Sequence, residues 1–221
     1  MAEAIPPPPA GGAIGTDESG KGDYFGPLVV AGVWVADGGR EALAELGVRD
    51  SKTVSDGQAR RLAAAVRSSH PTSIVAIGPE RYNELHGSMG NLNRLLAWAH
   101  ARVIENLLEK VPACRQVISD QFGDARLLER ALLERGRRVA LTQHPRAEAD
   151  PVVAAASIVA RAEFLSRLEA LSGRFGMPLP KGAGPPVLTA GQAFVRRHGV
   201  AALGQVAKLH FRTTRQVTGA A

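Results

Sequence analysis

Four acidic residues occupy positions from which a folded chain could bring them together. Asp17 and Glu18 follow one apolar stretch, Asp120 closes another, and Glu148 lies just before the start of a helix. Ligands of open α/β sheets bind beyond the carboxyl ends of central strands, so acids at two such ends are expected to meet if the strands are parallel neighbours. Crowded carboxylates repel one another and require cations, and oxygen-only ligands favour Mg²⁺ or Mn²⁺. The expected metal ligands are Asp17, Glu18, Asp120 and Glu148.

The choice of the fourth acid depends on Pro151. An acid before proline is typical of a helix start, with the acid as cap and the proline at the first helical position. Asp150 therefore has a structural reason to be acidic, which leaves Glu148 as the preferred ligand and Asp150 as the alternative. Because successive strand residues face opposite sides, Glu18 is expected to join Asp17 only if the chain leaves the strand there. The glycines at 20 and 22 would permit that change.

Residues 15–21 also match the opening of a phosphate-binding loop, G-x-x-x-x-G-K. Gly22 replaces the Ser or Thr that should hold Mg²⁺, and two acids would lie inside a cradle meant for phosphates. The following residues indicate a turn and a strand rather than the helix that such a loop requires. A P-loop nucleoside triphosphatase is therefore a disfavoured alternative.

An alternation of strands and helices must position these side chains. Apolar runs bounded by turn residues predict strands at 13–17, 28–35, 73–77, 116–120 and 138–142. Apolar periodicity and capping residues predict helices from 55 or 56 to 68, then at 91–110, 124–136 and 150–171. Two short helices are expected after a Pro/Gly-rich loop at 177–186. This order indicates an α/β domain with a mixed sheet and a helical C-terminal end.

Composition narrows the functional classes. The 221 residues carry 27 Lys and Arg against 21 Asp and Glu, a net charge of +6 that is consistent with a polyanionic partner. Cys114 is the one cysteine, so an intramolecular disulfide and a cysteine-based zinc site are excluded. The longest apolar run, 27–36, is too short to span a membrane, and the N-terminus is not a secretion signal. We therefore expect a cytoplasmic protein without a membrane partner.

Taken together, these motifs resemble a known family. Residues 15–28, Gly-Thr-Asp-Glu-Ser-Gly-Lys-Gly-Asp-Tyr-Phe-Gly-Pro-Leu, resemble the signature opening of type 2 ribonucleases H, in the form typical of bacterial ribonuclease HIII. Further matches follow in order at 49–52, 82–83, 91–93, 118–122, 154–161, 179–184 and 207–214. The resemblance implies a ribonuclease H-like fold, with about five strands flanked by helices and a C-terminal helical extension. The expected domains are a disordered Pro/Gly-rich tail at 1–12, a catalytic domain at 13–215 and a tail at 216–221.

The resemblance implies an endoribonuclease that hydrolyses the RNA strand of RNA–DNA hybrids and removes RNA from DNA. Two divalent cations, Mg²⁺ or Mn²⁺, would serve the reaction and leave 5′-phosphate and 3′-hydroxyl ends. The family's metal-binding acids fall on Asp17, Glu18 and Asp120, with the fourth on Glu148. The segment that approaches the RNA backbone and its 2′-hydroxyl corresponds to Gly20, Lys21 and Gly22. Other expected contacts with the hybrid, or with an RNA-containing duplex, are at Ser51, Lys52, Asn93, Lys181, Lys208 and His210.

Two features concern the subtype. The segments 23–26 and 208–214 favour ribonuclease HIII over ribonuclease HII. Ribonuclease HIII proteins typically carry an N-terminal substrate-binding domain with a TATA-box-binding-protein-like fold, and only about a dozen residues precede the catalytic motif here. We expect that domain to be absent and the protein to be a monomer. A non-catalytic hybrid-binding protein is the alternative from another class, and the intact acids argue against it.

Overall fold

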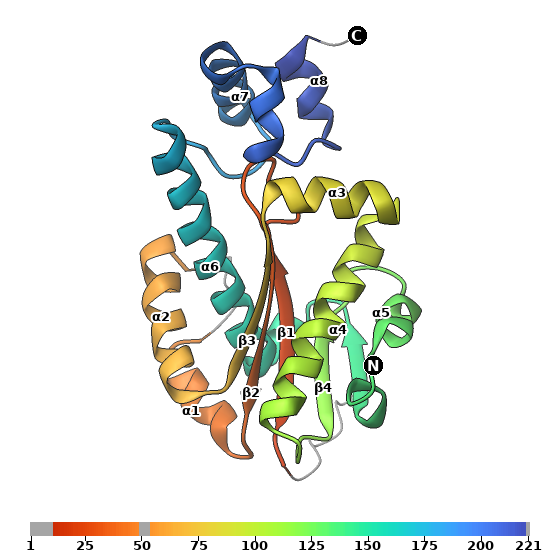
Figure 1. Cartoon of the computed structure of the whole chain (residues 1–221). Helices are drawn as coiled ribbons and strands as arrows, with labels where there is room; N and C mark the ends of the chain where they lie inside the picture. Colours follow the sequence, from red (N-terminus) through yellow and green to blue (C-terminus); the bar gives the residue numbers. More distant parts are fainter. Residues whose placement is uncertain (1–10, 49–53, 220–221) are drawn as a thin grey trace.

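A five-stranded mixed sheet forms the centre of the molecule, with helices on both faces (Figure 1). This computed structural model describes residues 11–48 and 54–219. The strand order is β3-β2-β1-β4-β5, in which β1 is antiparallel to β2 and parallel to β4. β2 and β3 pair antiparallel, whereas β4 and β5 pair parallel. The strands are β1 (Ala13–Ser19), β2 (Leu28–Val35), β3 (Thr72–Ile77), β4 (Gln116–Asp120) and β5 (Ala140–His144).

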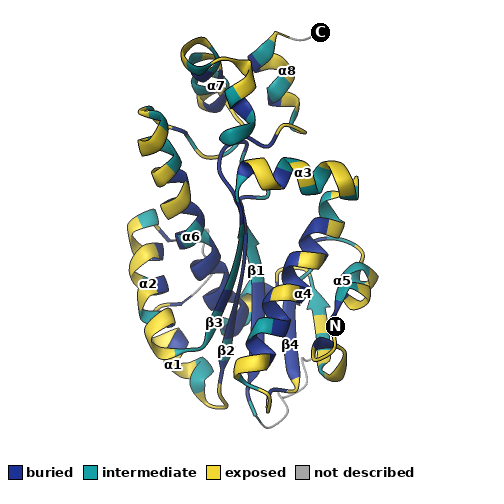
Figure 2. Cartoon of the chain, viewed as in Figure 1, coloured by how far each residue is buried: buried dark blue, intermediate teal, exposed yellow. Residues whose placement is uncertain are grey.

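Two layers of helices cover the sheet, and Figure 1 shows them on its opposite sides. One face carries α4 (Leu92–Lys110) and α5 (Ala125–Ala131). The other carries α6 (Pro151–Phe175), with α1 (Gly39–Glu45) and α2 (Asp56–Ser69) outside it. Most of β1, β2 and β4 is buried between these layers, whereas the edge strands β3 and β5 are partly exposed (Figure 2). The predicted α/β architecture is therefore confirmed.

Alternation along the strands divides the core into two parts. In β2, Leu28 and Val30 pack with α4, whereas Val29, Ala31 and Val33 pack with α6. In β1, Ile14 belongs to the α4 side. Gly15 faces α6, where an added Cβ would lie 2.4 Å from the backbone carbon of Val152. This close approach sets α6 directly against the strand that carries Asp17.

The C-terminal elements form a cap at one end of the sheet (Figure 1). They are α7 (Pro185–His198), the short 3₁₀ helix η4 (Val200–Gln205) and α8 (Arg212–Thr218), beside α3 (Pro79–Met89). Phe25 forms an isolated antiparallel bridge with Ala207, and the Gly26 amide donates to the Val206 carbonyl. The cap therefore contacts the turn that connects β1 to β2.

Several boundaries differ from the sequence-based expectation. β1 continues to Ser19, two residues beyond its predicted end, and β5 begins later because η2 (Gly136–Arg138) is a 3₁₀ turn. The amides of Gly11 and Gly12 bind the Asp37 carboxylate, and α8 continues past residue 215 to Thr218. The rest of the expected N-terminal tail, residues 1–10, lies outside the described residues. In the described parts of the chain, no helix is long and apolar enough to cross a membrane.

Candidate active site

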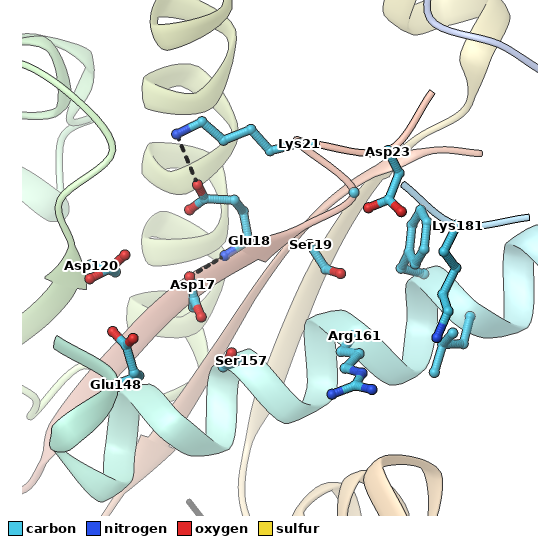
Figure 3. A pocket seen from close by; sticks show the side chains of 14 residues that line it. Asp17, Glu18, Ser19, Lys21, Asp23, Asp120, Glu148, Ser157, Arg161 and Lys181 are labelled. Atoms are coloured by element: carbon cyan, nitrogen blue, oxygen red, sulfur yellow. Dashed lines mark hydrogen bonds and ion pairs between the residues drawn. The ribbon is translucent and has the colours of Figure 1, made fainter. Parts of the chain in front are cut away.

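A hollow of about 440 Å³ opens beside the carboxyl ends of β1 and β4 (Figure 3). Its wall consists of β1, the turn after it, the end of β4, the 3₁₀ turn η3 (Ala147–Ala149), α6 and the segment before α7. All four predicted metal ligands line it. The lining residues are Asp17, Glu18, Ser19, Gly20, Lys21, Gly22, Asp23, Asp120, Glu148, Ser157, Arg161, Phe164, Leu165 and Lys181.

The register of two parallel strands brings Asp17 and Asp120 to the same end of the sheet. Thr16 of β1 is paired with Ser119 of β4, the last matched pair of these strands. The next residue of each strand is an acid, and both acids follow the alternation toward the α6 face. The proximity of Asp17 and Asp120, predicted if their strands were parallel neighbours, is thus explained by the observed topology.

Glu18 enters the site in a way that differs from the expectation. The chain does not leave the strand at this residue, because Glu18 remains in β1 and is paired with Val30 of β2. Its side chain therefore points toward α4, opposite to Asp17. β4 no longer pairs with β1 beyond Thr16, so both acids border the open edge of β1 and line the same hollow.

The charges of Asp17 and Glu18 are balanced in different ways. Burial, and then the neighbouring charge of Glu18, raise the pKa of Asp17 to about 8, although the Ser157 hydroxyl and the Glu18 amide (2.7 Å) donate hydrogen bonds to it. Burial alone would also raise the pKa of Glu18. Contacts with His100 (3.3 Å) and Lys21 (3.5 Å) outweigh burial and lower that pKa.

The segment before α6 brings in Glu148. An oxygen of Asp120 accepts a hydrogen bond from the Ala147 amide at 2.9 Å, which joins the end of β4 to η3. Glu148 follows and lines the hollow, whereas Asp150 does not. Asp150 instead caps α6 by accepting from the Val152 amide (2.8 Å) and pairs with Arg40 at 3.2 Å. The predicted helix start at Asp150 is confirmed.

The donor set of the hollow suits a hard divalent cation. Four carboxylates offer only oxygen ligands, which Mg²⁺ and Mn²⁺ prefer. Within residues 11–48 and 54–219, no three His, Cys, Asp or Glu side chains are gathered closely enough to bind one ion as they lie. In each of Asp17, Glu18 and Asp120, one carboxylate oxygen contacts a protein group. Burial first, and then the charge of Glu18, raise the pKa of Asp17, and a cation bound among these carboxylates would offset both effects.

Among the predicted substrate residues, Gly20, Lys21, Gly22 and Lys181 line the hollow. Gly20 has a φ of 88°, and a Cβ there would lie 2.2 Å from the Pro27 carbonyl oxygen. A Cβ on Gly22 would meet nothing within 4 Å. Gly20 therefore shapes the turn, whereas Gly22 exposes backbone that a ligand can approach.

The remaining predicted substrate residues lie elsewhere. Lys208 is fully buried, and its ammonium donates to the carbonyl oxygens of Asp23 and Gly26, each at 2.8 Å. The expectation that Lys208 contacts substrate is therefore wrong for this structure, because a phosphate cannot reach the ammonium. His210 stacks on His86 at 4.4 Å, and Asn93 lies at the start of α4, both away from the hollow's lining. Ser51 and Lys52 lie outside the described residues.

Two polar residues of α6, Ser157 and Arg161, belong to the hollow but were not predicted as site residues. They are one helical turn apart on the side that faces Asp17, and polar residues at this spacing in an apolar helix were the available signal. Arg161 also pairs with Asp56 at 2.7 Å, and Lys181 pairs with the same carboxylate at 2.6 Å. Asp56 therefore joins two cations at the rim, and hydrogen bonds chiefly from Lys181 lower its pKa.

The phosphate-loop alternative fails on topology. The segment after Lys21 is a turn that leads into the strand β2, so residues 15–21 are not followed by a helix. A phosphate cradle of the P-loop type needs that helix.

Comparisons with known proteins give a consistent result. The sequence model of the family described as Ribonuclease HII matches residues 14–214. The chain is 45% identical to the ribonuclease HIII of Protochlamydia amoebophila, across 93% of this chain and 68% of that protein. It is 44% identical to the ribonuclease HIII of Chlamydia pneumoniae, across 90% of this chain and 68% of that protein.

Solved structures agree with these sequence matches. Bst-RNase HIII in complex with Mn²⁺ superimposes with a TM-score of 0.87 at 35% identity, covering 94% of this chain and 69% of that one. The ribonuclease HII of Archaeoglobus fulgidus, solved with PCNA, gives a TM-score of 0.75 at 29% identity, covering 89% and 92%.

Proposed function

We propose a mechanism by which this chain, which belongs to the ribonuclease HII family of type 2 ribonucleases H and is an endonuclease, hydrolyses the RNA strand of RNA–DNA hybrids. Divalent metal dependence is typical of this family. The proposed ligands of two cations, Mg²⁺ or Mn²⁺, are Asp17, Glu18, Asp120 and Glu148. The observation that carries the proposal is that these four acids, from three separate segments, line one hollow.

The protein's part in the chemistry is to hold charge in place. Two bound cations would activate the attacking water and stabilise the charge on phosphorus and on the departing 3′-oxygen, leaving 5′-phosphate and 3′-hydroxyl ends. Ser157 donates a hydrogen bond to Asp17 and so directs its carboxylate from α6. Asp120 is held by the Ala147 amide, which also fixes the approach of Glu148.

Selection of RNA requires close approach to the sugar, because the 2′-hydroxyl distinguishes RNA from DNA. We propose that the exposed backbone at Gly22 makes that approach, with Lys21 nearby for the phosphate. Arg161 and Lys181 supply further positive charge at the rim, where substrate phosphates would compete with Asp56 for them. Ser51, Lys52, Asn93 and His210 remain proposed contacts for parts of the duplex beyond the hollow.

We also propose that the enzyme is of the ribonuclease HIII type and acts as a monomer. The HIII relatives at 44–45% identity support the subtype. The large hydrophobic side chains exposed in the described residues, Leu46, Trp98, Val200 and Leu209, belong to separate segments. Light scattering at a series of concentrations tests the monomer, and a mass that doubles with concentration contradicts it.

A cleavage assay tests the proposed mechanism. The substrates are a full RNA–DNA hybrid, a short RNA run in DNA and a single ribonucleotide in DNA, each with Mg²⁺, Mn²⁺ or EDTA. We expect cleavage only with metal, and Asp17→Asn and Asp120→Asn should retain hybrid binding while losing about 1,000-fold or more in rate. Near-normal turnover in either variant would contradict the two-cation proposal, and a gel shift without any cleavage by the wild type would support a binding protein.

A further inference from the structure

Behind the acidic hollow, a buried histidine contacts the strand that carries Asp17 and Glu18. His100 lies in α4 and has no exposed surface. Its Nε2 is 3.3 Å from Oε2 of Glu18, and its Nδ1 is 3.0 Å from Oγ1 of Thr16. Both ring nitrogens therefore have an oxygen partner on β1.

The surroundings of His100 restrict the orientation of its ring. Phe122, just after β4, stacks on the imidazole with ring centroids 4.8 Å apart and planes 28° apart. Ser119 of β4 approaches Nδ1 at 3.5 Å, and it is the register partner of Thr16. The imidazole thus lies over the junction of β1 and β4, one residue before Asp17 and Asp120.

The alternation of β1 explains why Glu18 needs such a contact. Asp17 points toward α6, whereas Glu18, the next residue of β1, points to the opposite face of the sheet, toward α4. An ionised carboxylate has no proton to donate, so Nε2–H of His100 is the donor in their contact. The other oxygen of Glu18, Oε1, meets Lys21, whose side chain is 39% exposed. One oxygen is held from the interior, while the other faces a lysine that solvent and ligands can reach.

We propose that His100 is a positioning residue of this enzyme, which orients Glu18 by a buried hydrogen bond so that one carboxylate oxygen stays directed at the hollow. The inference rests on the proposed function, in which Glu18 is a cation ligand. Hydrogen-bond partners behind a metal ligand fix its orientation, and their loss typically lowers metal affinity or activity by about 10–100-fold. His100 touches neither substrate nor cation in this role.

Three variants separate the hydrogen bond from packing. In His100→Gln, the side-chain amide can take the place of Nε2 and still donate to Glu18, whereas in His100→Asn it can replace only Nδ1 and serve Thr16. His100→Phe keeps a ring for Phe122 but removes both contacts. Leu107→Val is the stability control, because Leu107 is buried in the same helix two turns farther from the hollow.

The direct measurement is Mn²⁺ affinity, followed by calorimetric titration of the protein without nucleic acid. The unfolding temperature and the KM for the hybrid are measured beside it. We expect His100→Phe and His100→Asn to bind Mn²⁺ about 10–100-fold more weakly than the wild type, with His100→Gln close to the wild type. KM for the hybrid should change little, and Leu107→Val should lower the unfolding temperature without altering Mn²⁺ affinity.

These measurements distinguish failure of the proposed function at Glu18 from failure of the positioning role of His100. If the wild type and Glu18→Gln bind Mn²⁺ equally, Glu18 is not a ligand and the proposed function fails at that residue. If Glu18→Gln weakens binding but all three His100 variants match the wild type, only the positioning role is overturned. Equal weakening in His100→Gln, His100→Asn and Leu107→Val would also overturn it, because general destabilisation would then account for the loss.

Discussion

Asp17 of β1 accepts a hydrogen bond from Ser157 of α6, in the buried part of the acidic hollow. This single hydroxyl does not offset the burial of the carboxylate and the nearby charge of Glu18, so the pKa of Asp17 is raised to about 8. The enclosed position that suits a cation ligand therefore makes the metal-free protein less stable when Asp17 is ionised.

The first prediction concerns stability against pH in EDTA. The raised pKa keeps a proton on Asp17 of the folded protein up to about pH 8, whereas the unfolded chain releases it near the ordinary aspartate pKa of 3.8. A raised folded-state pKa gives stability that is complete below the unfolded pKa and is lost as pH rises toward the folded one. We expect Asp17→Asn to gain stability relative to the wild type by about 1 kcal/mol per pH unit between pH 5 and 8. Thermal unfolding in EDTA measures this difference, and parallel curves for the two proteins would contradict it.

The second prediction separates the two acids before α6. Glu148→Gln should reduce hybrid cleavage by about 100-fold or more, because it removes a proposed cation ligand. Asp150→Asn should retain cleavage, since asparagine caps helices as well as aspartate does and Asp150 does not line the hollow. Steady-state rates in Mg²⁺ and Mn²⁺ provide the measurement. If Asp150→Asn folds normally but loses most of its cleavage activity, Asp150 rather than Glu148 is the cation ligand.

The third prediction contrasts two lysines. Lys208→Met leaves the carbonyls of Asp23 and Gly26 without their buried donor, which should lower the free energy of unfolding by about 1–3 kcal/mol. Lys181→Met removes an ion pair at the surface, so stability should change by less than about 1 kcal/mol while hybrid binding weakens. Denaturant unfolding measures the stability of both variants, and titration with the hybrid measures their binding. Unchanged stability in Lys208→Met would show that its ammonium does not support the turn.

The fourth prediction uses two glycines of the same turn. Gly20→Ala should destabilise the fold by at least about 1 kcal/mol, because its φ of 88° and the Pro27 carbonyl leave no room for a Cβ. Gly22→Ala meets no neighbour, so the protein should fold normally while KM for the hybrid rises. Unfolding curves and hybrid kinetics test the pair. A Gly22→Ala enzyme with wild-type KM would indicate that the substrate does not approach this backbone.

Local signals in the sequence predicted much of the framework. The apolar spacing of 92–107 produced α4, and the Ser55 capping box and the Asp150 cap lie at the starts of α2 and α6. Two α-helices of the described residues were not predicted. α1 has seven residues, too short for a clear period, and α3 is largely polar, with Tyr82 as its buried anchor besides Pro79. These elements depend on tertiary packing rather than on their own pattern.

The acids of the site were predictable because three of them lie close to the ends of apolar strands and Glu148 lies just before a helix start, but their partners were not. His100 belongs to no sequence pattern that indicates a site residue, and only the pairing of β1 with β4 shows why a polar ring lies beside Thr16 and Glu18. Lys208 was expected to contact the substrate, because its burial also could not be predicted from the sequence. Its motif gives no sign of burial, which arises from the contact between the C-terminal cap and the 23–26 turn.

Anomalous diffraction from crystals soaked in Mn²⁺ most directly tests whether the four acids bind two cations. We expect two manganese peaks in the hollow, roughly 3.5–4 Å apart, with ligands from Asp17, Glu18, Asp120 and Glu148. Manganese bound elsewhere, or no peak among these side chains at saturating Mn²⁺, would contradict it.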